Sequence, residues 1–202
     1  MSQRSIHPYA PYVPAGAKTL IIGTIPPYRF CGGGERQLCA GDVDFYYGSR
    51  SNRFWQLVSA AAGVQLQYAD TPAAVEQRKN LLSALDMGIT DMVDSCVHRE
   101  GRSDDGALQE IKLWDLPGLL RAHPEIHTLL YTSRFVAKLV NRFADKGRHE
   151  GWDKGRLNGT VVIGGRPYAV RILYSPSPNA LRGVDRQVRQ AQYAQVFRMK
   201  KP

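Results

Sequence analysis

The sequence predicts an α/β fold in which helices cover both faces of a parallel sheet. Short apolar runs typical of buried strands occur at residues 18–23, 88–94, 128–132 and 168–173. The stretches between them carry the start and stop residues of helices. Strands that alternate with helices form parallel sheets, and their carboxyl ends meet at one edge, where α/β proteins place their functional residues.

The elements follow one another along a single predicted domain, residues 1–202. Residues 1–17, rich in proline, are expected to form an extended N-terminal arm packed on the body. A Gly-rich loop at 28–51 precedes a helix at 52–62, which Ser51 or Asn52 can cap. Further helices are predicted at 71–86, 115–122, 133–143 and 184–198. The runs at 160–163 and 168–173 flank two glycines and can form a hairpin that feeds the last strand.

Composition places the chain among ordinary globular proteins. No apolar run is as long as a membrane span, and the N-terminus lacks the hydrophobic region of a signal peptide. The three cysteines form an odd set, which fits a reduced compartment. We therefore expect a cytoplasmic monomer with no membrane contact.

Charge is distributed unevenly along the chain. Residues 1–101 are neutral overall, so residues 102–202 carry the whole net charge of +9. A one-sided basic surplus attracts polyanions, chiefly nucleic acids. The alternative is that the charge serves solubility alone.

The stretch Tyr174–Gly183 (YSPSPNALRG) stands between the last predicted strand and the last predicted helix. Its two prolines fix the backbone and remove hydrogen-bond donors, so a stiff loop is expected, neither helix nor strand. A rigid loop after a strand is a typical place for binding residues, although a plain turn would look the same.

Four segments, taken in order, resemble the uracil-DNA glycosylase superfamily. Gly23–Pro27 (GTIPP) resembles its first motif, Gly-x-x-Pro-Gly. Tyr46–Trp55 (YYGSRSNRFW) is similar to a segment of the mismatch-specific and hypoxanthine-type branches, and Gly88–Asp94 (GITDMVD) resembles a strand of the mismatch-specific branch. Ser175–Asn179 (SPSPN) resembles the second motif, His-Pro-Ser-Pro. Each motif alone is weak, but their common order covers nearly the whole chain.

The resemblance implies a three-layer α/β/α fold with a central four-stranded, mostly parallel sheet. It also implies excision of a deaminated or mismatched base, such as uracil or hypoxanthine, from double- or single-stranded DNA. The base is flipped out before its N-glycosidic bond is hydrolysed, through an oxocarbenium-like sugar. No lysine lies in these motifs, so strand cleavage through a Schiff base is not expected.

The resemblance also assigns roles to residues of the expected base pocket. Tyr47 aligns with the aromatic residue that stacks on the flipped base, with Tyr46 as the alternative. The backbone of Thr24 and Ile25 would contact the base. Asn52 could orient water or hold a base edge, although it is also a plain candidate for a helix cap.

Two positions depart from the family pattern. Many branches carry a water-orienting Asp or Asn where this chain has Ile25, so that role passes to Asp44, Asn52 or Asp91. Ser175 replaces a histidine that supports the leaving base, and a hydroxyl is a weaker donor. The Asn179 amide could provide a further donor to the leaving base.

The DNA contacts implied by the resemblance follow the second motif. Ser177 matches the residue that grips the DNA backbone. Leu181 matches an apolar wedge that fills the gap left by the flipped base, and Arg182 could meet a phosphate or the orphan base. The alternatives are a buried leucine and a solvated arginine.

No metal or other cofactor is expected. Cys31, Cys39, Cys96 and His98 lack the close paired spacing of zinc sites, and the iron–sulfur branches of the superfamily use four cysteines. The sequence thus predicts a metal-free monofunctional DNA glycosylase. Two alternatives stay open: a superfamily member that binds DNA or modified bases with little catalysis, and an unrelated nucleotide-binding α/β enzyme.

Overall fold

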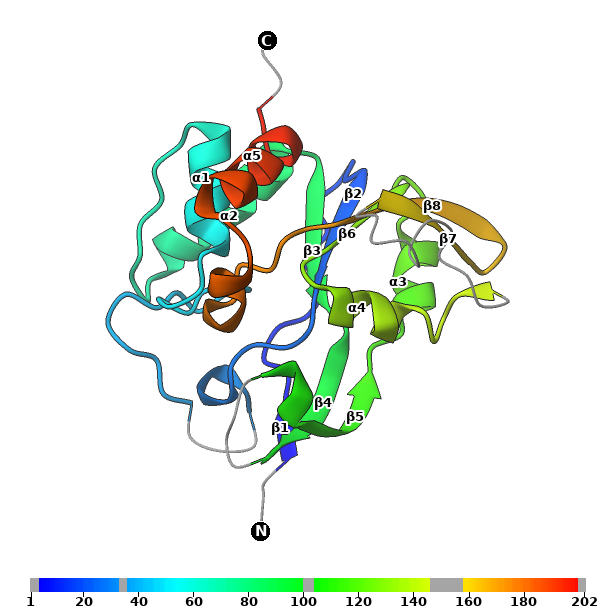
Figure 1. Cartoon of the computed structure of the whole chain (residues 1–202), viewed down its shortest axis with the longest axis horizontal. Coiled ribbons are helices and arrows are strands. Elements are labelled where there is room, and N and C mark those ends of the chain that lie inside the picture. The colour runs from blue at the N-terminus through cyan, green and yellow to red at the C-terminus, as the bar shows by residue number, and fades with distance from the viewer. Residues whose placement is uncertain (1–3, 33–35, 100–103, 146–157, 200–202) are drawn as a thin grey trace.

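The centre of the molecule is a five-stranded sheet with the strand order β3-β2-β6-β8-β7 (Figure 1). The computed structural model describes residues 4–32, 36–99, 104–145 and 158–199, with only the backbone of Leu181 and Arg182. Strand β2 pairs in parallel with β3 and β6, and β6 pairs in parallel with β8. The strands are β2 (Thr19–Gly23), β3 (Met87–Asp91), β6 (Thr128–Tyr131), β7 (Asn158–Ile163) and β8 (Arg166–Ile172).

The predicted number of four strands is wrong, because the sheet gains β7 at one edge. Strand β7 pairs antiparallel with β8 through a turn at Gly164 and Gly165, whose φ values of +58° and +77° suit glycine. The hairpin predicted at these glycines is therefore confirmed. Both of its strands join the central sheet, with Val161 and Ile163 buried in the core.

Helices cover both faces of the sheet, as predicted. The face that carries Ile21, Ile89 and Leu130 packs against α1 (Phe54–Ala62), α2 (Pro72–Ala84) and α5 (Arg186–Val196). The opposite face, with Leu20, Ile22 and Leu129, packs against α3 (Leu116–Ala122) and α4 (Arg134–Val140). Successive strand residues thus enter opposite cores, which explains why β2, β3 and β6 are buried along nearly their whole length. No helix in the described parts of the chain is both long and apolar enough to span a membrane.

Short polar side chains fix the helix starts. The Thr71 hydroxyl accepts from Ala74 N at α2, and the Ser133 hydroxyl accepts from Val136 N at α4. Helix α1 begins differently from the prediction, because Arg53 occupies the cap position and makes no side-chain cap bond. Asn52, one residue earlier, accepts from Phe54 N through Oδ1 at 2.9 Å.

A second, three-stranded antiparallel sheet lies at the end of the molecule near the N-terminus (Figure 1). Its order is β1 (Arg4–Ile6), β4 (Val93–His98), β5 (Leu108–Leu113). The chain passes from β3 into β4 through Met92, whose N–H donates to Gly23 O at 2.9 Å. Residues 97–106 were predicted as a polar loop, but Val97 and His98 are the last residues of β4.

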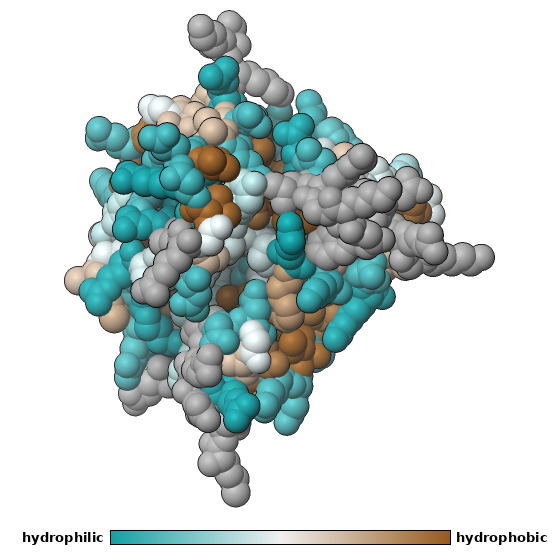
Figure 2. Space-filling view, in the orientation of Figure 1, coloured by the Kyte–Doolittle hydropathy of each residue, from teal (hydrophilic) through white to brown (hydrophobic). Residues whose placement is uncertain are grey.

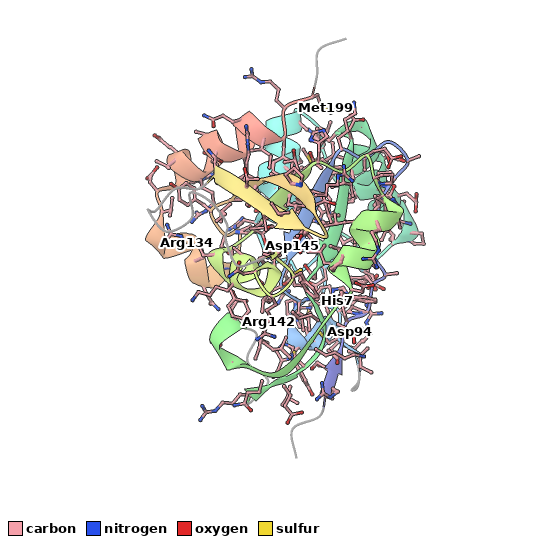
Figure 3. All side chains as sticks on the ribbon, turned by 90° about the vertical axis from the view of Figure 1, so that its right-hand side faces the viewer. His7, Asp94, Arg134, Arg142, Asp145 and Met199 are labelled. Carbon is pink, nitrogen blue, oxygen red and sulfur yellow. The ribbon has the colours of Figure 1, made fainter. Side chains whose placement is uncertain are left out.

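Part of the predicted N-terminal arm belongs to this second sheet. Strand β1 pairs with β4, and the backbone N–H of His7 donates to Asp94 O at 2.8 Å (Figure 3). Further along, Tyr12 forms an isolated antiparallel bridge with Ile89 at the edge of the central sheet. The first segment of the chain thus contacts both sheets through its backbone, which sequence periodicity over so few residues could not indicate.

Candidate functional site

A cavity of about 630 Å³ opens where β2, β6 and β8 end. Figure 2 shows a recess near the middle of the face that is turned toward the viewer. Its wall is built from residues within segments 24–29, 47–52, 104–105, 132–135 and 175–180. A cavity of this size suits a small organic ligand such as a base with its sugar.

The cavity brings together most of the residues predicted for a base site. Those that line it are Thr24, Ile25, Tyr47, Asn52, Ser175, Ser177 and Asn179. Asp44 and Asp91 are not part of its lining. The side chains of Leu181 and Arg182 lie outside the described parts of the structure, so their predicted contacts with DNA stay predictions.

Tyr47 is fixed at both ends of its side chain. Its ring stacks on Phe54 with centroids 4.3 Å apart, and its hydroxyl bonds to Thr132 Oγ1 at 2.9 Å. Its backbone has φ +54°, a left-handed conformation that costs a tyrosine free energy. Burial, and then the charge of Asp91, raise the pKa of Tyr47 well above its ordinary value, so the phenol stays protonated. The cavity therefore has a rigid, neutral aromatic wall.

Asp91 lies behind this wall. A Cβ added to Gly23 would fall 2.1 Å from Asp91 Oδ1 and 2.1 Å from the Tyr47 hydroxyl, so both groups pack on the bare Gly23 backbone. Asp91 Oδ2 accepts from His7 Nε2 at 3.0 Å. Asp91 thus supports the cavity from the interior, where it does not face a ligand.

The Asp44 carboxylate, in the 28–51 loop, is bound by Tyr9 and Arg36. Its Oδ1 accepts from the Tyr9 hydroxyl at 2.8 Å and also pairs with Arg36. Burial, reinforced by the bond to Asp44, raises the pKa of Tyr9 above its ordinary value. The carboxylate therefore anchors this loop to the N-terminal segment.

Asn52 stands where two cavity loops meet. Its backbone N–H donates to Ser49 O at 2.8 Å, and the next N–H, of Arg53, donates to Pro176 O at 3.1 Å. With Oδ1 bound to Phe54 N, no hydrogen bond among the described residues uses its Nδ2. The side chain therefore serves the helix start through its oxygen and lines the cavity with a free amide donor.

The loop after β8 is held rigidly by α5. Tyr174 N donates to Gln192 Oε1 at 2.7 Å, and the Tyr193 hydroxyl donates to Tyr174 O at 3.2 Å. The second half of the loop is a 3₁₀ helix, Pro178–Gly183, which corrects the prediction that it is not helical. Pro178 favours this start, because its fixed φ suits a first helical residue.

The Gly-rich loop is organised by a residue that sequence reasoning missed. The Asp42 carboxylate is fully buried, pairs with Arg29, and accepts from Arg50 N at 2.8 Å and Cys39 N at 2.7 Å. Burial alone would raise its pKa, but Arg29 and the two backbone donors outweigh burial and lower it. Arg29 also donates to Ser49 Oγ at 2.9 Å, which brings its guanidinium into the cavity wall.

Two further groups line the wall, and the sequence assigned neither of them a role in the site. Thr132 to Phe135 follow β6, so their position at a strand end was a usable signal. Asp104 and Asp105 precede β5, a strand of the second sheet, and no pattern in the sequence placed them here. Burial raises the pKa of Asp105, while the nearby Thr24 hydroxyl lowers it in part.

The cysteines are free thiols. Burial raises the pKa of Cys31 to about 12 and that of Cys96 to about 11, so both are unreactive near neutral pH. Among the described residues, no three side chains of the metal-binding types form a group that could hold an ion.

Comparisons with known proteins bear on the fold. No protein-family model matches the chain, and no curated protein matches its sequence. Among solved structures, the chain is similar to a solution structure from Methanosarcina acetivorans, described as a "putative Uracil DNA glycosylase". The two share 20% sequence identity, with a TM-score of 0.61 over 98% of this chain and 97% of the other. The chain therefore shares the fold of that protein over nearly its whole length.

Proposed function

We propose that the protein is a DNA glycosylase that hydrolyses the N-glycosidic bond of a deaminated base, uracil or hypoxanthine, flipped out of DNA. The observation that carries the proposal is the convergence of the predicted base-site residues, from widely separated segments, on one cavity at the ends of the parallel strands. The fold shared with the Methanosarcina protein supports it.

The cavity offers a surface for the base. Tyr47, stacked on Phe54 and tied to Thr132, would present the flat π surface on which a flipped base stacks. The backbone of Thr24 and Ile25 would meet the edge of the base. A ring so firmly held loses little conformational freedom when the base binds, which favours affinity.

Polar groups on the wall would bind the base and its leaving charge. The free Nδ2 of Asn52 can donate to a base carbonyl or to water. Ser175 and Asn179 offer a hydroxyl and an amide to the negative charge that develops on the departing base. These neutral donors stabilise that charge less strongly than a charged group would.

The DNA backbone would lie along the rim at Ser177. Its hydroxyl and neighbouring backbone suit phosphate oxygens, and α5 and the flanking prolines keep this loop rigid. Beyond it, we propose that Leu181 enters the base stack and that Arg182 contacts a phosphate or the orphan base.

A second candidate function is DNA or modified-base binding with little hydrolysis. It is favoured by Ile25, which cannot orient water, and by Ser175, a weaker donor than the family histidine. The two candidates differ in one measurable property, the release of a free base.

The test uses oligonucleotides that carry uracil, hypoxanthine, xanthine or a G·T mismatch, followed by alkaline cleavage of abasic sites. We expect release of uracil or hypoxanthine, and a large loss of release in Asn52→Ala. A matched control is Thr71→Ala, which removes the α2 cap far from the cavity at a similar cost of about 1 kcal/mol. Salt-sensitive DNA binding with no base release would favour the second candidate, and no DNA binding at low salt would refute both.

A further inference from the structure

The proposed reaction needs a group that accepts a proton from water, and the predicted candidates do not supply one. Ile25 is apolar, and the Asn52 amide is not basic. Asp44 is held by Tyr9 and Arg36 outside the cavity lining, and Asp91 is held by His7 behind Tyr47. The proton acceptor must therefore come from another part of the cavity wall.

Asp105 is placed for this task. It lies at the start of a short 3₁₀ helix, Asp105–Ala107, and lines the cavity with its carboxylate half-buried. Thr24 of the first motif lines the same cavity, and its hydroxyl acts on the pKa of Asp105, so the two side chains are neighbours. The second sheet thus brings a carboxylate to the position beside the first motif where Ile25 provides none.

We propose that Asp105 is the general base that activates the hydrolytic water, an inference that rests on the glycosylase function proposed above. As the C1′–N bond breaks, its electron pair leaves with the base, which then takes a proton from solvent. The water oxygen bonds to C1′, and a water proton passes to the Asp105 carboxylate and later to solvent. The negative carboxylate also stabilises the positive charge of the oxocarbenium-like sugar.

The surroundings of Asp105 raise the pKa of its carboxyl group. Burial raises its pKa, the Thr24 hydroxyl lowers it in part, and the neighbouring carboxylates of Asp104 and Asp91 raise it further. Among the described residues, the titratable groups that act on Asp105 are Asp91, Asp104 and Tyr47, and Arg29 and Arg134 are the charged groups that line the same cavity. Because only the ionised form accepts a proton, base release should fall as the pH drops through this raised pKa, above the ordinary value of about 3.9.

The experiment measures single-turnover base release against pH, together with DNA affinity, on whichever base the wild-type protein releases best. Asp105→Asn should lower the rate by about 10²–10⁴-fold, the usual contribution of a general base, and leave the affinity for DNA nearly unchanged. Asp105→Glu should retain an acid limb in the pH profile, whereas the residual activity of Asp105→Asn should lack one. Asp70→Asn removes an exposed aspartate in the turn before α2 and serves as the control with wild-type rates.

The outcomes separate the two proposals. If the wild type releases a base and Asp105→Asn does so with the same rate and pH profile, Asp105 is not the base, although the glycosylase function stands. A loss confined to Asp104→Asn would overturn the assignment in favour of its neighbour. If the wild type releases no base from any substrate, the function and the inference both fail. If Asp105→Asn unfolds at a lower temperature than the wild type, the test rests on Asp105→Glu. Loss of the acid limb from the pH profile of Asp105→Glu would contradict the proposal.

Discussion

Gly23 determines the position of the aromatic wall of the cavity. The Tyr47 hydroxyl and Asp91 Oδ1 occupy the space that any side chain at this residue would need. Tyr47 also has a strained backbone, which its stacking on Phe54 and its bond to Thr132 must offset. The first motif, Gly23–Pro27, thus shapes the site in two ways. Gly23 leaves room for Tyr47 and Asp91 because it has no side chain, and the motif also contributes its backbone groups.

The Gly23→Ala substitution tests this close packing. We expect the free energy of unfolding to fall by about 1–3 kcal/mol, because an overpacked core forces side chains away from their preferred positions. Displacement of Tyr47 should also lower base release. Gly183→Ala is the matched control, since a Cβ there would meet no atom within 4 Å. Urea unfolding of both variants provides the measurement, and equal stability of the two would show that the space around Gly23 can relax.

At the scale of elements, the site depends on irregular segments held by charged and polar anchors. The 28–51 loop contains one short 3₁₀ helix, Tyr28–Phe30, in its described part and otherwise takes its shape from Asp42. The loop after β8 takes its shape from α5, through Gln192 and Tyr193. Rigid loops on a regular scaffold are the usual way to position binding groups precisely enough for chemistry.

Asp42→Asn tests the anchor of the 28–51 loop. Removing one partner of a buried ion pair should cost about 3 kcal/mol of unfolding free energy near neutral pH. Because the pKa of Asp42 is lowered in the folded protein, its carboxylate stabilises the fold above the ordinary value of about 3.9. That stability is lost as the pH falls through the lowered pKa. The difference between variant and wild type in urea unfolding should therefore shrink in acid, and a constant difference would contradict this account.

The elements also show what the sequence could and could not predict. Strands β2, β3 and β6 are mostly apolar runs, and β8 alternates buried and exposed residues after a Gly-Gly turn, so local patterns located them. Strand β1 has three residues, and β5 alternates weakly, so only their pairing with β4 defines them. Tyr47 and Asn52 were found because they lie in short motifs. Asp105 and Asp42 were missed, because partners distant in the chain or buried backbone donors give them their roles.

At the scale of the whole molecule, charge favours a polyanionic partner. The net charge of +9 comes from the second half of the sequence, which also supplies three of the cavity segments, 104–105, 132–135 and 175–180. Arg134 is exposed where it lines the cavity (Figure 3). A net positive charge, with Arg134 at the cavity, fits the proposed function of holding phosphates while acting on one base.

The dependence of DNA affinity on salt measures this charge directly. The logarithm of the binding constant should fall linearly with the logarithm of salt concentration, because phosphate contacts release counterions. Arg134→Ala should reduce the magnitude of that slope by about one, the contribution of one phosphate contact. Arg121→Ala, which removes an exposed arginine of α3 outside the cavity lining, should leave the slope unchanged. Equal slopes for the wild type and Arg134→Ala would place the DNA elsewhere.

The hydrogen bond from Arg53 N to Pro176 O has a consequence for synthesis of the chain. It joins a segment that is translated early to one that is translated much later. Strands β2, β3 and β6 can pair while translation continues, but the cavity lacks a wall until β8 has joined β6 and α5 holds the following loop. A nascent or truncated chain thus has a partial sheet without a complete binding site. The proposed binding of DNA would then become possible only after α5 has been synthesised.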